Sequence, residues 1–188
     1  HSDAGGYTSI GLPVTGGITR SEELLFRWLE TNAFTALLRT HEGNQPERNA
    51  QIYDNAKTLS FFDRCARIYA ALFNYRSTLV REAHEKGWPV VRALVLHYPA
   101  DLTAQTLMDQ FLLGSDILVA PVFTPGQRHR KVYLPAGNWT HLWSGKQHHS
   151  TQNRWVTVPA PLGEPPVFFV SDSAAGQNLR RQLKAQGL

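Results

Sequence analysis

The chain has 188 residues, of which 42% are hydrophobic, 11% aromatic and 18% charged. This length suits one sizeable domain, or one domain with a small appendage, and the composition excludes a disordered or collagen-like chain. No apolar run approaches the roughly 18 residues that a transmembrane helix needs, so we expect no membrane span. The sequence begins at His1, without Met, at what resembles the end of a strand, and we therefore expect that an upstream part is missing.

The charge balance gives little sign of an acidic partner. The chain carries 19 Lys and Arg against 15 Asp and Glu, a net charge of +4. The cations gather only at residues 127–131 and at Arg180 and Arg181, where polar or small neighbours indicate a solvated face. We therefore expect no nucleic-acid partner. The single cysteine, Cys65, can form no internal disulfide and falls on the apolar side of an expected helix, which indicates a buried structural thiol.

The first expected elements lie between two polar clusters. Residues 1–7 are polar and contain a glycine pair, as expected where a strand opens into a loop, and residues 11–17 continue that loop. Ser21, followed by two glutamates, predicts the N-terminus of a helix. The apolar run at 33–38 predicts a strand buried on both faces, and the polar residues 39–44 follow it directly.

The next elements continue an alternation of strand and helix. Residues 57–86 carry apolar side chains at helical spacing, and Gly87 is placed to end this long helix. Residues 90–96 predict a second buried strand, and residues 103–113 a helix ending at Gly114. Such alternation is typical of a parallel α/β architecture.

The texture of the sequence changes after Ser115, where short β-rich runs are separated by Pro-Gly, Ala-Gly and Ser-Gly pairs. The runs are residues 117–120, 131–134, 139–143, 155–158 and 167–170. Regularly spaced short strands with such turns predict an antiparallel sandwich. We therefore predict two units, at 1–115 and 116–188.

The polar clusters suggest a binding site. In parallel α/β folds the carboxyl ends of the strands meet on one face, so residues that follow two strands are expected to lie together. Acids, a cation, imidazole and amide are the donors and acceptors that a polyhydroxylated ligand needs. Taken singly, each residue is equally suited to capping a strand or fixing a loop. The first cluster holds His1, Ser2, Asp3 and Tyr7, and the second Arg39, His41, Glu42 and Asn44.

Three motifs carry a family resemblance. They are His1-Ser2-Asp3-Ala4-Gly5-Gly6-Tyr7, Arg39-Thr40-His41-Glu42-Gly43-Asn44 and Gly114-Ser115-Asp116-Ile117-Leu118-Val119-Ala120-Pro121-Val122. With Leu134-Pro135-Ala136-Gly137-Asn138-Trp139, they make nearly the whole chain resemble the glycoside hydrolases of family 31. Within that family the first two motifs are most similar to those of the bacterial sulfoquinovosidases, which release sulfoquinovose from its α-glycosides.

The resemblance implies both a fold and an activity. It implies the last part of a (β/α)8 TIM barrel, roughly its sixth to eighth strands, followed by a C-terminal antiparallel β-sandwich. It implies a retaining α-glycosidase that uses two aspartates, a nucleophile and a general acid/base. By the family pattern both aspartates lie upstream of His1, so we expect no catalytic residue, no cofactor and no metal in this chain. We expect a small carbohydrate partner and a bacterial cytoplasmic location.

The resemblance also assigns roles to four residues of this chain. His41 matches a histidine that hydrogen-bonds hydroxyls of the glycone, and Arg39 is placed to orient neighbouring carboxylates. Tyr7 matches a tyrosine that helps to hold the sulfonate in the sulfoquinovosidases. We assign Asp3 to support of the pocket, with proton transfer as the less favoured alternative. Glu42 is expected to fix the loop, as is the nearby Asn44.

Two other functions stay open. One is an α-glucosidase or α-xylosidase of the same family. The other is a non-catalytic carbohydrate-binding module, for which Trp139, Trp143 and Trp155 would form a sugar-stacking platform, although their strand spacing favours core positions. His148 and His149 lack carboxylate or cysteine companions, which favours an exposed hairpin tip over a metal site.

Overall fold

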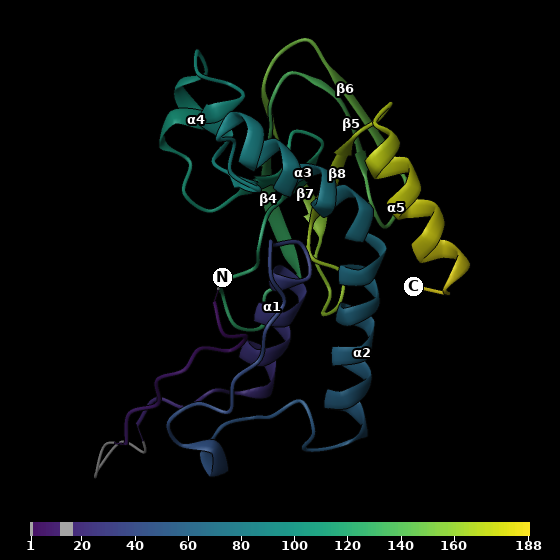
Figure 1. Cartoon of the computed structure of the whole chain (residues 1–188). Coiled ribbons are helices and arrows are strands. Elements are labelled where there is room, and N and C mark those ends of the chain that lie inside the picture. The colour runs from purple at the N-terminus through teal and green to yellow at the C-terminus, as the bar shows by residue number, and fades with distance from the viewer. Residues whose placement is uncertain (1, 12–16) are drawn as a thin grey trace.

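A computed structural model describes residues 2–11 and 17–188 (Figure 1). His1 and residues 12–16, the middle of the expected loop, lie outside the described residues. The helices are α1 (Glu22–Asn32), α2 (Ala56–Ala71), α3 (Phe73–Lys86), α4 (Leu102–Thr106) and α5 (Ala174–Ala185), with 3-10 turns η1 (Pro46–Arg48) and η2 (Leu94–Leu96). The strands are β1 (Val91–Arg92), β2 (Phe111–Leu113), β3 (Ile117–Val119), β4 (His129–Leu134), β5 (Gly137–His141), β6 (Gln147–Ser150), β7 (Arg154–Pro159) and β8 (Val167–Val170).

Helix α1 begins where the sequence predicts. The Ser21 hydroxyl accepts a hydrogen bond from the Leu24 N–H at 3.2 Å and so caps the helix. Leu25, Phe26 and Leu29 are buried along one side of α1, at the apolar spacing of an amphipathic helix. The prediction of a helix here is confirmed.

The strand predicted at residues 33–38 does not form. Helix α1 leads instead into a tight turn at Ala33 and Phe34, and both side chains are fully buried. A short, continuously apolar run has no hydrophobic period, so its sequence cannot distinguish a buried turn from a buried strand. Only Thr40, beyond the run, pairs with another strand residue, in a parallel bridge to Ala4.

The single helix predicted at residues 57–86 is two helices, α2 and α3, broken at Leu72. The buried Arg76 in α3 donates from Nη1 to the carbonyl of Tyr69 at 2.6 Å. That carbonyl belongs to the last turn of α2, where its backbone donor is the Leu72 N–H at 3.3 Å. The arginine therefore gives the end of one helix a second donor from the start of the next.

The broad apolar face predicted for this segment is only partly buried. Leu59, Phe73 and Val80 are exposed, whereas Cys65 is fully buried as predicted. Gly87 ends α3 in the left-handed conformation, at φ +74°, also as predicted.

The next two predicted elements are also wrong. Residues 90–96 form only the two-residue strand β1 and the turn η2, and residues 103–113 divide into the short helix α4 and strand β2. β1 pairs antiparallel with β2, and β2 antiparallel with β3. The apolar residues of 103–113 are compatible with a helix or with a strand. Pairing with β1 and β3 makes residues 111–113 a strand.

The strands form a six-stranded sheet, in the order β1-β2-β3-β8-β5-β6, and a two-stranded sheet of β4 and β7. Every pairing between these named strands is antiparallel. The five β-rich runs after Ser115 each contribute a strand, so those predictions are confirmed, whereas β6 and α5 were not anticipated. Because β1 and β2 join this sheet, its hydrogen bonds cross residue 115. The division into 1–115 and 116–188 stays a prediction.

The six-stranded sheet is buried on both faces. On one face Leu113, Ile117 and Phe169 pack in a cluster with residues of α1, α2 and α5. On the other face Leu118 and Phe168 pack with residues of β4 and β7. In Figure 1 α1 and α2 run below the strands and α5 lies beside them. The chain is thus an antiparallel sheet domain with helices, and the barrel and the sandwich stay predictions.

The three tryptophans form no common platform. Trp139 is buried in the cluster between the two sheets, whereas Trp143 packs against the cluster on the opposite face. Trp155 is partly exposed and packs beside Tyr133, with ring centroids 5.1 Å apart. The predicted core position is confirmed for Trp139. No helix in the described part of the chain has the length and apolar character to cross a membrane.

The hairpin tip predicted at His148 and His149 is wrong for His148. Both residues lie within β6, and the His148 ring is buried against Phe168, with centroids 5.5 Å apart. Only the second histidine is exposed, because the two side chains point to opposite faces of the strand.

Candidate functional site

The two polar clusters lie side by side, as the sequence predicts. The Ala4 N–H donates to the carbonyl of Arg39 at 2.9 Å, and the Asn44 N–H donates to the carbonyl of Tyr7 at 3.1 Å. With the parallel bridge between Ala4 and Thr40, these bonds tie the two segments together at both ends. Backbone pairing, rather than a salt bridge alone, therefore fixes their register.

Asp3 and Arg39 form an ion pair across this junction. The Arg39 Nε lies 3.1 Å from Asp3 Oδ1, with the aspartate mostly buried and the arginine half exposed. Among the described residues, that Oδ1 has no well-directed hydrogen-bond donor. That oxygen is itself buried, so the carboxylate keeps one enclosed acceptor without a well-directed donor in the described part of the chain.

Tyr7 and His41 meet edge to face, with ring centroids 5.0 Å apart and planes at 74°. His41 Nδ1 accepts a hydrogen bond from the Gly43 N–H at 3.0 Å. In the neutral ring, this bond leaves the proton on Nε2, which is then a donor. Tyr7 is 51% exposed, so the phenol is accessible from solvent. The structure brings all four predicted site residues onto adjoining loops, and their role in binding stays a prediction.

Two further polar residues hold the loops, as expected. The Asn44 side chain accepts from the Ser9 N–H at 2.7 Å and donates to the Ser9 carbonyl at 3.0 Å. Glu42 Oε1 accepts from the Tyr53 hydroxyl at 2.9 Å. Both contacts are within the protein, so these side chains fix the loops.

Arg20, which lies under both loops, was not identified from the sequence. Its side chain is buried and donates to the backbone carbonyls of Gly6 and His41, among others. Burial lowers the pKa of Arg20, while the nearby charges of Tyr53, Asp54 and Asp3 act in the opposite sense. In sequence it is one arginine in a polar stretch before a helix cap.

Two glycines allow this close packing. A Cβ on Gly5, at φ +82°, would clash with Arg20 Cδ. A Cβ on Gly43, at φ +86°, would lie 2.6 Å from Asn49 Nδ2 and 2.9 Å from the carbonyl oxygen of Tyr7. Both the left-handed backbone and the lack of space therefore require glycine.

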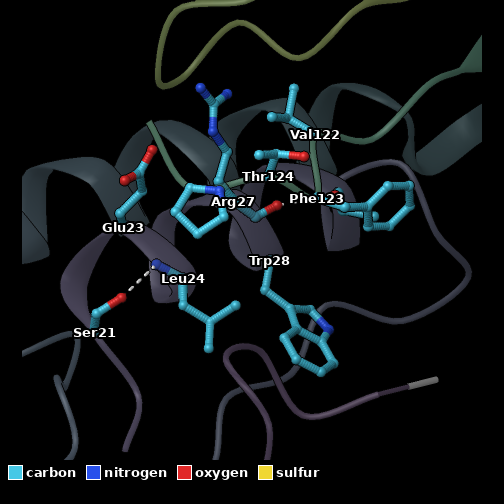
Figure 2. A pocket seen from close by; sticks show the side chains of 10 residues that line it. Ser21, Glu23, Leu24, Arg27, Trp28, Val122, Phe123 and Thr124 are labelled. Carbon is cyan, nitrogen blue, oxygen red and sulfur yellow. Dashed lines mark hydrogen bonds between the residues drawn. The ribbon is translucent and has the colours of Figure 1, made fainter. Parts of the chain in front are cut away.

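The best-defined cavity lies beside this site and has different chemistry. It has a volume of about 230 Å³, and Figure 2 shows α1 residues on one side of it and the segment from Val122 on the other. Its lining is mostly apolar, and Glu23 is already bound to Gly126 and Arg128. Trp28 links the two regions, because it lines the cavity and donates from Nε1 to the Ser2 hydroxyl at 2.7 Å. The cavity does not suit a sugar.

The residues that the structure describes include no group of three or more His, Cys, Asp or Glu side chains that would hold a metal ion.

Comparison with known proteins identifies the family. Residues 87–174 match the model of the glycosyl hydrolase family 31 C-terminal domain. The whole chain is 46% identical, over 188 residues, to a sulfoquinovosidase of Agrobacterium fabrum (strain C58 / ATCC 33970). The chain belongs to glycosyl hydrolase family 31. The resemblance of its motifs to this family is thereby confirmed.

Other members of family 31 are also similar to this chain in sequence and in structure. A sulfoquinovosidase of Escherichia coli (strain K12) is 44% identical over 173 residues, which are 92% of this chain and 24% of that protein. A family 31 sulfoquinovosidase from E. rectale, solved with the aza-sugar inhibitor IFGSQ, superposes with a TM-score of 0.88 at 39% identity, over 100% of this chain and 27% of that one. A family 31 α-xylosidase from a soil metagenome, solved with xylose, gives a TM-score of 0.79 at 28% identity, over 95% of this chain and 28% of that one.

The chain is much shorter than these relatives. It spans 27% of the length of the Agrobacterium protein, although that match covers 100% of the chain. The described residues therefore correspond to a C-terminal portion of such an enzyme.

Proposed function

We propose that this chain is the C-terminal portion of a retaining α-glycoside hydrolase that releases sulfoquinovose from α-sulfoquinovosides. The observation that carries the proposal is the meeting of Tyr7 and His41, with ring centroids 5.0 Å apart, on two loops tied by backbone bonds. The 46% identity to a sulfoquinovosidase supports the same substrate. Nothing in this chain is proposed as nucleophile or general acid/base, and both aspartates are proposed to lie in the upstream part.

The four residues have complementary roles in the proposed glycone wall. The Nε2–H of His41 donates to a sugar hydroxyl, and Asp3, whose Oδ1 is buried, supports the pocket. Arg39 holds the Asp3 carboxylate in place through the ion pair at 3.1 Å. The Tyr7 phenol donates to one sulfonate oxygen, a charge-assisted bond that needs cationic help from the upstream part.

The same proposal covers the architecture. Residues 1–115 would supply the last part of a (β/α)8 barrel, and residues 116–188 a β-sandwich. The parallel bridge between Ala4 and Thr40 supports the first, since neighbouring barrel strands run parallel. The apolar cluster shared by the two sheets supports the second.

Removal of one hydroxyl tests the substrate. In the full-length enzyme, Tyr7→Phe is expected to lower kcat/KM for an aryl α-sulfoquinovoside by about ten- to a hundredfold, the cost of one hydrogen bond to a charged group, and to change an aryl α-glucoside much less. Tyr133→Phe is the matched control, since it removes a hydroxyl that lies in neither loop and bonds Asp101 within the protein. Equal losses on both substrates would contradict a sulfonate contact at Tyr7.

A comparison of substrates also separates the alternatives. Preference of the wild-type enzyme for an aryl α-glucoside or α-xyloside would favour the second candidate, which the likeness to the soil-metagenome α-xylosidase supports. The 188-residue chain alone should hydrolyse none of these substrates. Turnover by the chain alone would refute the placement of both catalytic carboxylates upstream.

A further inference from the structure

We infer that Arg20 is a positioning residue that sets the placement of Tyr7 relative to His41 from beneath the two loops. The inference rests on the proposed function, in which both rings contact the glycone. Arg20 acts through the backbone of the two loops, and its guanidinium bonds neither ring in the structure.

The guanidinium of Arg20 binds three segments of the chain at once. Its six acceptors are five backbone carbonyls and one side-chain amide oxygen. Nε donates to Ala50 at 2.7 Å; Nη1 to Ala4 at 3.1 Å, Gly6 at 3.2 Å and His41 at 2.8 Å; and Nη2 to Glu42 at 3.2 Å and to Gln51 Oε1 at 2.8 Å. Five N–H groups therefore serve six acceptors, and at least one of them is shared.

One nitrogen joins the two loops that carry the rings. Arg20 Nη1 reaches the carbonyl of Gly6, the residue before Tyr7, and also the carbonyl of His41 itself. The peptide of Gly6 leads directly into Tyr7, so this nitrogen fixes the origin of both side chains. A shift of Nη1 would therefore move the two rings apart or together.

Burial makes this arrangement stiff. Arg20 is 4% exposed, so a broken bond here leaves a buried polar group without water to replace it. Gly5 packs so closely on the Arg20 stem that a Cβ there would lie 2.0 Å from Arg20 Cδ. The planar five-donor fork of arginine suits such a set of carbonyls, whereas a lysine has three donors on a point charge.

A buried arginine elsewhere in the chain provides the matched control. Arg76 is also buried and also donates to three backbone carbonyls, those of Thr35, Tyr69 and Ala33, at 2.9, 2.6 and 2.8 Å. These carbonyls belong to the end of α2 and to the turn after α1, and none is a carbonyl of residues 2–7 or 39–44. Arg76→Lys thus causes the general loss from a buried arginine without disturbing the proposed site.

The test compares Arg20→Lys with Arg76→Lys in the full-length enzyme. Arg20→Lys is expected to lower the ratio of kcat/KM values, sulfoquinovoside over glucoside, by about tenfold or more, since small misplacement of a binding group is costly. In a Tyr7→Phe background the same change should alter the ratio less than threefold. Arg76→Lys should leave the ratio unchanged. An equal ratio in both lysine variants, or an undiminished effect in the Tyr7→Phe background, would overturn the inference.

A crystal structure of the Arg20→Lys enzyme gives a readout that needs no substrate. The centroids of Tyr7 and His41 should separate beyond the 5.0 Å of the wild type. Unchanged rings would overturn the inference whatever the enzyme hydrolyses. A wild-type enzyme inactive on sulfoquinovosides refutes the proposed function alone, and the crystal comparison still decides the role of Arg20.

A milder variant covers failure of Arg20→Lys to fold. Gln51→Ala removes one acceptor of Nη2, together with the bonds that Gln51 Nε2 donates to the carbonyls of Glu42 and Pro46. It should lower the substrate ratio by about two- to fivefold, as expected for a partly released guanidinium. A folded Gln51→Ala enzyme with an unchanged ratio would count against the inference.

Discussion

The rings of Tyr7 and His41 meet edge to face on two separate loops. The hydrogen bond from the Gly43 N–H to His41 Nδ1 determines which nitrogen of the neutral imidazole carries the proton. Since Nδ1 is the acceptor, Nε2 carries the proton in the neutral ring and presents a donor. The pair therefore offers a phenol and an imidazole N–H within a distance that one monosaccharide can bridge.

This tautomer predicts an order for two substitutions at His41. In His41→Gln the amide N–H takes the place of Nε2–H, whereas in His41→Asn the amide oxygen takes the place of Nδ1 and the distal donor is lost. In the full-length enzyme, we expect kcat/KM for an aryl α-sulfoquinovoside to fall about a hundredfold in His41→Asn. In His41→Gln we expect it to fall only about tenfold. The reverse order would contradict the Nε2–H assignment.

Two glycines in the left-handed region predict unequal losses of stability. Gly87→Ala should lower the free energy of unfolding by about 1 kcal/mol, since φ is +74° but nothing lies within 4 Å of the added Cβ. Gly5→Ala adds a clash with the Arg20 stem to the same backbone cost, so we expect a loss of about 3 kcal/mol or more. Urea unfolding of both variants measures the difference. Equal losses would mean that Arg20 moves aside freely.

Two ion pairs with the same N–O distance are expected to contribute very differently to the free energy of unfolding. Arg27 Nη1 to Glu30 Oε1 and Arg67 Nε to Asp63 Oδ2 are both 2.8 Å, but the first pair has side chains 6% and 1% exposed and the second 51% and 57%. Arg27→Met should lower the free energy of unfolding by about 3–5 kcal/mol, because it leaves Glu30 buried without its cation. Arg67→Met should change it by about 0.5 kcal/mol or less.

The buried pair also links two regions of the chain. Arg27 donates to the carbonyls of Gln127 and Ala160, and Gly163 donates to Glu30 Oε2 at 2.8 Å. Burial raises the pKa of Glu30 to about 7, against the opposing effect of the arginine. A small loss in Arg27→Met, comparable with that of Arg67→Met, would show that these carbonyls find other donors.

The buried His141 predicts a dependence of stability on pH. It is 5% exposed, and burial lowers its pKa from 6.5 to about 4. The unfolded chain binds this proton more readily, so His141 should lower the free energy of unfolding by up to about 3 kcal/mol as the pH drops from about 6.5 to about 4. Glu30, with its pKa raised from 4.5 to about 7, acts in the opposite sense over the same range. Burial lowers the pKa of His148 as well, which adds in the same sense as His141.

A variant isolates this contribution. In His141→Asn the amide oxygen keeps an acceptor for Ser144, which lies 2.9 Å from Nδ1 in the wild type, but the titrating group is gone. As the pH falls from 7 to 4, the free energy of unfolding in urea should drop further, or rise less, in the wild type than in the variant. Equal slopes would mean that other groups cause the acid sensitivity.

The sequence alone determined the helix from Ser21, the stop at Gly87, the short strands after residue 115 and the family. Each of these depends on local chemistry: a capping hydroxyl, a left-handed glycine, short β-rich runs between turn residues, or a motif of adjacent residues. The motifs likewise indicated Asp3, Tyr7, Arg39 and His41 as one set.

Only the tertiary structure decided the elements and contacts that depend on distant partners. The run at 33–38 became a buried turn and part of 103–113 became a strand, because packing and pairing choose between states of similar local energy. Arg20 has no local signal at all, since its six acceptors come from residues 4–51 and meet only when the chain is folded. A buried charge is stabilised by the sum of such contacts, and that sum is a property of the fold.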